Sequence, residues 1–123
     1  MTNLLQFPRR PDITLYHFGR IIISARIVKA LSLDPGDAIN ITIHEGEYLL
    51  YAIHQPFGRH EAQCYPSKRG SHNFCANSVR LSRALLNAAK VQTLRASFLA
   101  GDLLTINDKK YIPIITAHPI RCS

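Results

Sequence analysis

The sequence predicts a mainly β, single-domain protein, a barrel built from two pseudo-symmetric β-β-α-β-β halves. Two observations predict this class. The 123 residues are divided by turn-forming residues into short apolar runs rich in strand formers, and a helix-like segment recurs later in the chain with the same residue types. We place the halves at about residues 12–55 and 62–118. Residues 1–11, interrupted by Pro8 and Pro11, are expected to form a flexible N-terminal arm.

Two short strands open the first half. Residues 13–18 combine β-branched and aromatic side chains, which favour strands. Gly19 then permits a turn or bulge, and the Arg-Ile-Ile-Ile run at residues 20–23 predicts the second strand.

A short helix is expected at residues 25–32, because Ser24 is a good N-cap and the apolar residues that follow have helical spacing. The residues on its apolar face are Ile27, Val28 and Leu31. Arg26 and Lys29 then point elsewhere. Two helical turns are unstable alone, so packing must hold this helix in place.

A turn and a β-hairpin complete the first half. In the turn at residues 34–37, Pro fixes one φ and Gly supplies a positive one. Residues 38–44 alternate strictly between apolar and polar types, and a hairpin turn at 45–47 leads into a strand at 48–53. The side chains expected on the buried face of the first strand are Ile39, Ile41 and Ile43.

The second half repeats the helix of the first. The segment Ser78–Leu85 (SVRLSRAL) matches Ser24–Leu31 (SARIVKAL) at Ser, Arg, Ala and Leu, 54 residues further on. Around it, strands are expected at residues 62–65, 72–76, 93–99, 102–106 and 110–116, the last two joined at Asn107-Asp108. One such half buries too little apolar surface to fold alone. Two halves that interleave their hairpins leave few free sheet edges.

Three segments carry a family resemblance: Gly19–Ser24 (GRIIIS), Ile27–Leu33 (IVKALSL) and Pro35–Ile41 (PGDAINI). Together they resemble the AbrB/SpoVT family of transition-state regulators and antitoxins, over about residues 13–54. The resemblance implies an AbrB-like swapped-hairpin barrel, related to the double-psi barrel, that binds double-stranded DNA and in some members a toxin.

Three positions depart from the family pattern: Ser24 stands where Pro is usual, Ser32 where Gly is common, and Val28 where a basic residue is common. The second half keeps the helix without the Gly-Arg strand start or the Gly-Asp turn.

The formal net charge of +7 favours a polyanionic partner, nucleic acid first. Arg20 matches the strand arginine that faces DNA in the family, and guanidinium groups can fork onto phosphate or guanine. Helix residues form an approximate two-fold set, and the arm and one loop add cations suited to the phosphate backbone. These residues are Arg26, Lys29, Arg80 and Arg83 on the helices, and Arg9, Arg10, Lys68 and Arg69 in the arm and loop. The alternative is that all of them are simply solvated, on a barrel that serves as a protein-interaction or assembly module.

Other function classes find little support in the sequence. No phosphate loop or nucleophile elbow is present, so we expect no enzyme and no cofactor. The odd number of cysteines, Cys64, Cys75 and Cys122, predicts free thiols. Zinc is not expected, because Cys64 and Cys75 are too far apart in the sequence for a ligand pair and, with His72, leave His60 as the only candidate fourth ligand. Without a signal peptide or a membrane-length apolar run, the chain is expected to be cytoplasmic, as a monomer or homodimer.

Overall fold

The strands form two antiparallel sheets, seen here in a computed structural model that describes residues 10–122. Sheet A has the order β10-β7-β1-β2-β6-β5, and sheet B has the order β3-β4-β9-β8. The strands of sheet A are β1 (Ile13–Tyr16), β2 (Arg20–Ile23), β5 (Tyr65–Pro66), β6 (Phe74–Asn77), β7 (Arg95–Phe98) and β10 (Arg121–Cys122). Those of sheet B are β3 (Ala38–His44), β4 (Glu47–Ile53), β8 (Leu104–Ile106) and β9 (Lys109–Ile114). The predicted mainly β class is confirmed.

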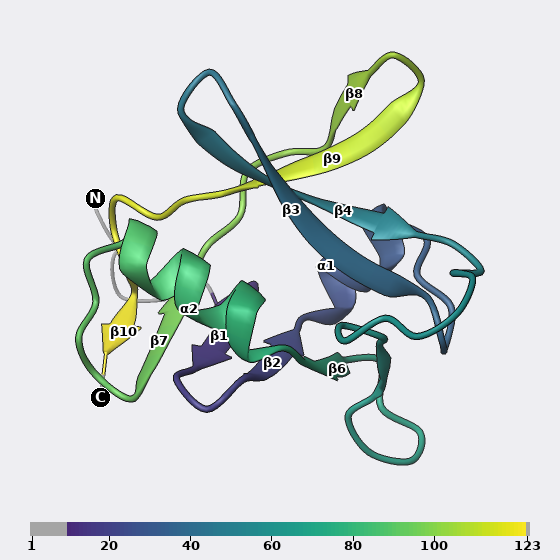
Figure 1. Cartoon of the computed structure of the whole chain (residues 1–123), viewed down its shortest axis with the longest axis horizontal. Coiled ribbons are helices and arrows are strands. Elements are labelled where there is room, and N and C mark those ends of the chain that lie inside the picture. The colour runs from purple at the N-terminus through teal and green to yellow at the C-terminus, as the bar shows by residue number, and fades with distance from the viewer. Residues whose placement is uncertain (1–9, 123) are drawn as a thin grey trace, which may run out of the picture.

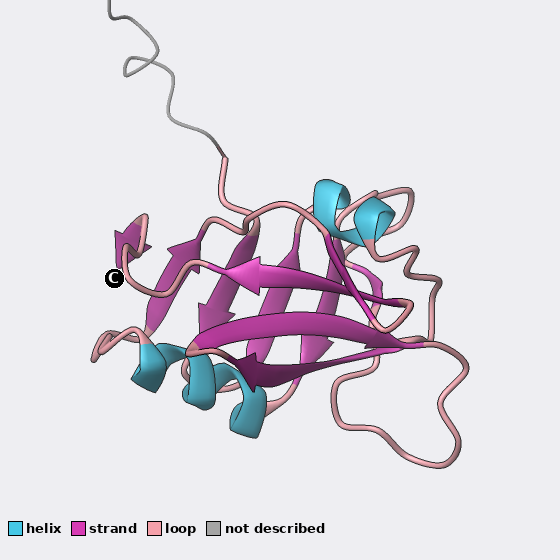
Figure 2. Ribbon diagram, turned by 90° about the horizontal axis from the view of Figure 1, so that it is seen from above, coloured by secondary structure: helices cyan, strands magenta, loops and turns pink. Residues whose placement is uncertain are grey.

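The two sheets face each other, and the two helices lie on opposite sides of the pair (Figure 2). Helix α1 (Ala25–Ala30) connects β2 to β3, and helix α2 (Val79–Ala88) connects β6 to β7. The β3–β4 and β8–β9 hairpins extend away from sheet A and diverge toward their turns (Figure 1). Sheet A therefore keeps one outer face on the opposite side of the molecule from the hairpin turns.

The core lies between the sheets and is closed by the helices. Alternate residues of the sheet A strands are buried, as expected for strands that face a core on one side. They are Ile13, Leu15, Ile21, Ile23, Phe74, Ala76, Ala96 and Phe98. Sheet B and the helices contribute Leu50, Ile112, Ile27, Leu31, Leu81 and Leu85. The alternation also fixes which side chains of sheet A point outward.

The first half has the predicted β-β-α-β-β order, but its helix begins differently from the prediction. Ser24 occupies the N-cap position without a side-chain hydrogen bond, and its Oγ is buried without a partner. Instead, the backbone N–H of Ala25 donates to Asn73 Oδ1 at 2.9 Å. In α2 the expected cap is present, because Ser78 Oγ accepts from the N–H of Leu81 at 3.1 Å.

Both helices end in the same way. Ser32 after α1 and Lys90 after α2 have positive φ values of 55° and 59°. The next N–H groups reach back to helix carbonyls: Leu33 to Val28 and Val91 to Leu86, each at 2.9 Å. These bonds stop each helix with a left-handed residue other than glycine. Helix α1 accordingly ends at residue 30 and not at residue 32.

The buried face predicted for β3 extends over only part of the strand. Ile39 is buried and Ile41 is half-buried, but Ile43 is 62% exposed. The prediction is wrong at Ile43 because the outer end of the hairpin extends beyond the two packed sheets, where no element covers it (Figure 1). The hairpin turn itself is confirmed, with positive φ at Glu45 and Gly46.

Most strands expected in the second half are present in shorter form, but the strand predicted at residues 62–65 overlaps β5 only at Tyr65. The segment predicted at 93–99 is ordered as β7 over residues 95–98, and the predicted final hairpin is β8–β9. β10 was not predicted. Its pairing with β7 couples Arg121 to Ser97 and extends sheet A at one edge.

The strand ladders of the described residues form two open sheets and not the closed barrel predicted from the sequence. Two isolated bridges link sheet B to connecting segments next to sheet A, one between Ala38 and Gln63 and one between Ala100 and Ile114. Within residues 10–122, no helix has the length and apolar character needed to cross a membrane.

Candidate functional site

A row of polar and aromatic side chains crosses the outer face of sheet A. Arg95 on β7 pairs with Tyr16 on β1, and Arg20 on β2 pairs with Asn77 on β6. The neighbours of these residues along each strand are buried, so the four side chains share the outer side. The row spans four adjacent strands, and neighbouring strands lie about 4.8 Å apart. Arg20 and Arg95 are therefore about 10 Å apart across the sheet.

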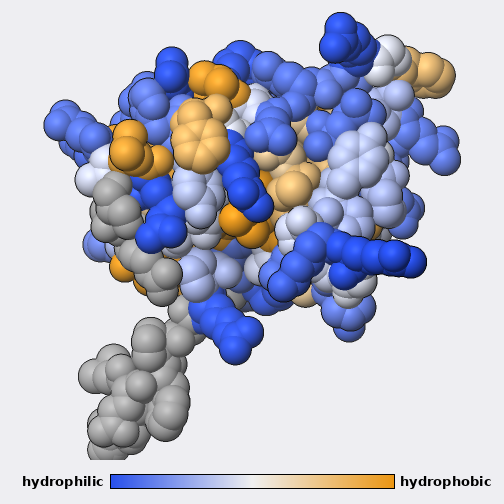
Figure 3. All heavy atoms as spheres, turned by 90° about the horizontal axis from the view of Figure 1, so that it is seen from below, coloured by the Kyte–Doolittle hydropathy of each residue, from blue (hydrophilic) through white to orange (hydrophobic). Residues whose placement is uncertain are grey.

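Aromatic rings lie beside these arginines. The guanidinium carbon of Arg95 is 5.9 Å from the centre of the Tyr16 ring, within cation–π range. The Phe18 ring lies 5.2 Å from the Tyr16 ring, and Phe18 is 65% exposed. Figure 3 looks onto this side of the molecule and shows hydrophobic side chains set among strongly hydrophilic ones.

Helix α2 extends this surface at one end of the β1–β2 hairpin. Ser82 Oγ donates to the carbonyl of Tyr16 at 2.6 Å, which fixes the helix to the end of β1. The next residue, Arg83, is exposed, and its Nε donates to the carbonyl of His17 at 3.3 Å. We call Tyr16, Phe18, Arg20, Asn77, Arg83 and Arg95 the basic face.

Arg26, predicted as a DNA contact, is bound to a buried carboxylate. Its Nε and Nη2 donate to Asp12 Oδ1 and Oδ2 at 3.0 and 3.1 Å, and Nη2 also reaches the carbonyl of Ala100. Asp12 is 3% exposed and also accepts from the Ala100 N–H at 2.8 Å. The hydrogen bond to Asp12 raises the pKa of Arg26, against the opposing effect of burial. This arginine therefore ties α1 to the ends of β1 and β7.

The other predicted contacts are spread over several surfaces. Arg80 Nε donates to Glu61 Oε1 at 2.7 Å in an exposed ion pair. Lys29 is exposed on α1, at the opposite end of the molecule from α2. Lys68 and Arg69 are exposed in the loop between β5 and β6. Arg10 is exposed just before β1, whereas Arg9 lies outside the described residues.

Charge is divided unevenly between the two sides of the fold. The chain has eight acidic residues, and seven of them occur in residues 34–61 and 102–108, which form sheet B, its turns and adjoining loops. The eighth, Asp12, is buried against Arg26. The six strands of sheet A and both helices contain no acidic residue. The cations of the basic face thus have no carboxylate on their own elements.

The two cysteines whose side chains are described, Cys64 and Cys75, are free thiols. Burial raises the pKa of the Cys64 thiol to about 12, with smaller contributions from Asp37 and Cys75. The side chain of Cys122 lies outside the described residues. Among the residues the structure describes, no group of three or more His, Cys, Asp or Glu side chains is placed to hold a metal ion.

Asp37 is a buried carboxylate at the start of β3. Burial acts to raise its pKa, but hydrogen bonds from the Asp34 N–H, the His54 ring and the Gln55 N–H outweigh this and hold it below its usual value. The His54 Nδ1 lies 2.7 Å from Asp37 Oδ2. This pair fixes the orientation of the imidazole at the end of β4.

Sequence reasoning did not identify Tyr16, Phe18 or Arg95 as site residues. The alternation of residues 13–16 places Tyr16 on the polar side of its strand, so this pattern could have identified Tyr16 as an outward-facing residue. The position of Arg95 depends on the pairing of β7 with β1, across some 80 residues of chain, which no local signal predicts. No family model, curated protein or solved structure matches this chain.

Proposed function

We propose that this protein binds nucleic acid, with double-stranded DNA as the preferred ligand, through the basic face of sheet A. The observation that carries the proposal is the division of charge: the strands of sheet A and both helices contain no acidic residue, while most carboxylates lie in sheet B, its turns and the loops that adjoin it. A surface of one sign attracts a polyanion and raises its rate of association.

The basic face combines two kinds of contact that nucleic acids use. Arg20 and Arg83 offer guanidinium groups to phosphates or to guanine edges. Tyr16 and Phe18 offer partly exposed rings on which an unpaired base could stack. The basic loop at Lys68 and Arg69 would add phosphate contacts beyond the edge of the sheet.

Support for an AbrB-like architecture comes from the strand registers. β2 and β6 begin 54 residues apart and pair so that residue 20 meets 77 and residue 23 meets 74. Such a register is what a two-fold axis between the two strands would require. β4 and β9 pair across the middle of sheet B with residues 48, 49 and 50 against 114, 113 and 112. We infer an internal duplication, in which the segment from β5 to β9, with helix α2, repeats the segment from β1 to β4, with helix α1.

An insertion of one helical turn in the second half explains why the spacing between equivalent residues of the two halves changes along the chain. Ser24 and Ser78 are 54 residues apart, whereas Ser32 and Lys90, which end the helices, are 58 apart. The difference of four residues corresponds to about one turn of helix, and α2 is indeed the longer helix. A regulator or antitoxin-like role, with a toxin as a second partner, is the function that this architecture favours.

A protein-interaction module is the competing proposal, and one observation favours it. Phe18 and Leu94 are 65% and 71% exposed, and the His17 N–H donates to the Leu94 carbonyl at 2.8 Å, which places both residues near the end of β1. Exposed apolar side chains close to one another commonly mark a protein contact. The same surface therefore predicts two different partners that a binding experiment can separate.

The test is fluorescence anisotropy with labelled mixed-sequence duplexes over a range of salt concentrations. Wild type is expected to bind with a log–log salt slope of about −0.9 per phosphate contact. The Arg20→Ala, Arg83→Ala double variant is expected to weaken binding at least about tenfold and to flatten the slope by nearly 2. Arg59→Ala, which removes one exposed loop cation outside the basic face, serves as the matched control and is expected to have little effect.

Three results would contradict this proposal or redirect it. Absence of binding at tens of micromolar protein in low salt, where non-specific binders usually register, would refute nucleic-acid binding and leave the interaction module. An equal loss in Arg59→Ala would show that total charge and not the basic face is responsible. Tighter binding to single strands, lost in Tyr16→Ala with Phe18→Ala, would assign the face to unpaired bases and not to duplex DNA.

A further inference from the structure

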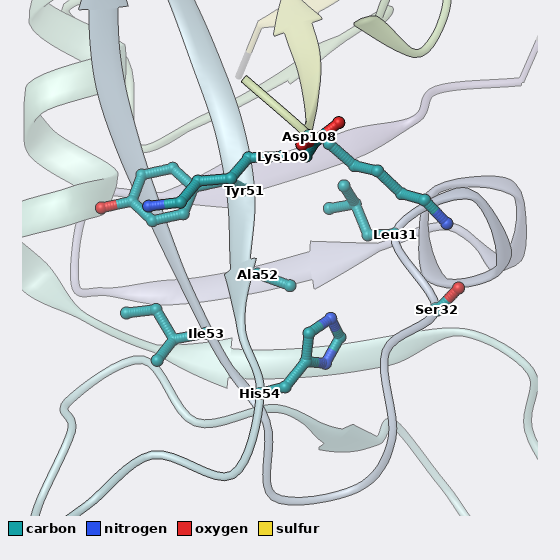
Figure 4. Close-up of a pocket in the computed structure, with 9 residues that line it drawn as sticks. Leu31, Ser32, Tyr51, Ala52, Ile53, His54, Asp108 and Lys109 are labelled. Carbon is teal, nitrogen blue, oxygen red and sulfur yellow. The ribbon is translucent and has the colours of Figure 1, made fainter. Parts of the chain in front are cut away.

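A pocket of about 480 Å³ opens on the other side of the molecule from the basic face, between the end of α1, the end of β4 and the β8–β9 turn. Figure 4 shows its lining residues, which come from these three separate segments. Its apolar lining includes Leu31, Ala52 and Ile53. Its polar lining includes Ser32, Tyr51, His54, Asp108, Lys109 and Lys110. The volume is in the range of sites for small molecules.

Positive charge gathers at this pocket from two directions. Lys109 and Lys110 begin β9, directly after the turn residue Asp108. Lys110 alternates with the buried Ile112, so it points to the inner side of the strand. His54 faces the same pocket from the end of β4. Lys109 alternates with Tyr111 and so points to the other side of the strand, which leaves Lys110 as the lysine directed into the pocket, with His54 and the single carboxylate of Asp108 beside it.

His54 is held in place for contact with a ligand. Its Nδ1 is bound to the buried Asp37 at 2.7 Å, and Asp37 is in turn held by backbone N–H groups. With Nδ1–H donated to Asp37, Nε2 on the other side of the ring donates to an anion in the pocket when the ring is the doubly protonated imidazolium. The side chain of His54 is 53% exposed, so a ligand can reach it.

A second pocket provides an internal comparison. It measures about 240 Å³ and lies between the β3–β4 turn at residues 46–48 and the end of β9 at residues 113–117. Under the proposed duplication these segments correspond to the β8–β9 turn and the end of β4. Its only charged lining residue is Glu47, and it has no cation. The cations are therefore peculiar to the larger pocket and do not follow from the fold of the hairpins.

We propose that the larger pocket is a binding site for a small organic anion, a carboxylate or phosphate monoester attached to a compact apolar body. Lys110 and His54 would contact the anionic group from opposite sides, with the Ser32 hydroxyl as an additional donor. The apolar body would lie against Leu31 and Ala52. This proposal uses no residue of the basic face, so it stands or falls separately from nucleic-acid binding.

The test is titration of the ¹⁵N-labelled full chain with benzoate, phenyl phosphate and neutral benzamide, followed by amide chemical shifts. Benzoate or phenyl phosphate is expected to give saturable shifts at Ser32, Ala52 and Lys110, and benzamide is expected to give none. The preferred anion identifies whether the site suits a carboxylate or a phosphate. Amides of the smaller pocket, such as Gly46, are expected to stay unchanged.

Variants assign the effect to the pocket. Lys110→Gln and His54→Gln are each expected to weaken anion binding about tenfold or more, because each removes a charge-assisted hydrogen bond. Both residues are exposed, so the amide spectrum is expected to retain its dispersion. Lys90→Gln, which removes an exposed lysine at the end of α2, is the matched control.

Three outcomes would overturn the proposal. The first is absence of saturable shifts up to about 10 mM anion, the weakest binding worth calling a site. The second is equal binding of benzamide, which would show that the cations do not select the ligand. The third is equal weakening in Lys90→Gln, which would reduce the effect to the net charge of the protein.

Discussion

Replacing Asp12 by alanine is expected to destabilise the protein strongly, although this residue belongs to no motif. Its carboxylate is 3% exposed and accepts from the Ala100 N–H at 2.8 Å and from two nitrogens of Arg26. Removal leaves the Ala100 amide, itself 1% exposed, without this acceptor. A buried donor that loses its partner costs about 1–3 kcal/mol.

Loss of the ion pair adds a smaller amount. The Arg26 side chain is 39% exposed, so water screens the pair and can take over part of its hydrogen bonding. We therefore assign about 1 kcal/mol to it, near the upper end for exposed pairs. The expected loss is about 2–4 kcal/mol, which for a domain of this length lowers Tm by roughly 8–15 °C.

Urea unfolding followed by far-UV circular dichroism measures this loss, since the chain contains no tryptophan for fluorescence. Glu61→Ala is the matched control, because it breaks the exposed pair with Arg80 and is expected to cost less than about 1 kcal/mol. If Asp12→Ala costs no more than Glu61→Ala, the carboxylate does not hold α1 to the sheet as described, and the reasoning fails.

Three further predictions concern turns, titration and helix caps. Gly19 has φ +112° and lies against the first residue of α2, so Gly19→Ala is expected to cost about 1–3 kcal/mol in urea unfolding. Gly58→Ala, at φ +73° with open space around it, is expected to cost about 1 kcal/mol in the same measurement. Because the pKa of Asp37 is lowered in the folded state, its contribution to stability is present above about pH 4 and is lost as pH falls through the folded value. In Asp37→Asn, the profile of Tm against pH is expected to lose this part of its acid dependence. An unchanged profile would contradict the assignment. Ser78→Ala removes the hydrogen bond that caps α2 and is expected to cost about 1 kcal/mol in urea unfolding. Ser24→Ala removes a buried hydroxyl that has no hydrogen-bond partner and is expected to be neutral or stabilising. Equal costs would show that the two serines cap their helices in the same way.

Local signals predicted the first half well. The Gly46 turn and the strict alternation of residues 38–44 specify a hairpin with few alternatives, and the structure has it at these positions. The helix after Ser24 was also correctly placed, although its cap was not. These features depend on residues close together in the chain, and the relevant rules concern backbone conformation and periodicity.

Features that depend on distant partners were not predictable in the same way. Exposure of Ile43 follows from how far the hairpin extends past sheet A, which the alternation of β3 does not encode. β10 consists of two residues and exists through its pairing with β7. The role of Arg26 depends on Asp12 and Ala100, which approach it from the ends of two other strands. The local sequence around an arginine on a short helix does not distinguish a side chain bound to a carboxylate from one that is solvated.

The two helices show why a sequence repeat does not imply repeated function. Arg26 and Arg80 occupy the same place in the motif, yet one is tied to a buried carboxylate and the other to an exposed glutamate. Only α2 adds an arginine, Arg83, to the end of the β1–β2 hairpin. The cations that face a partner are therefore distributed asymmetrically about the inferred two-fold axis. Under the proposed binding of duplex DNA, a single chain would offer one basic face and not two equivalent ones, and recognition of a palindromic site would require a second copy of the protein.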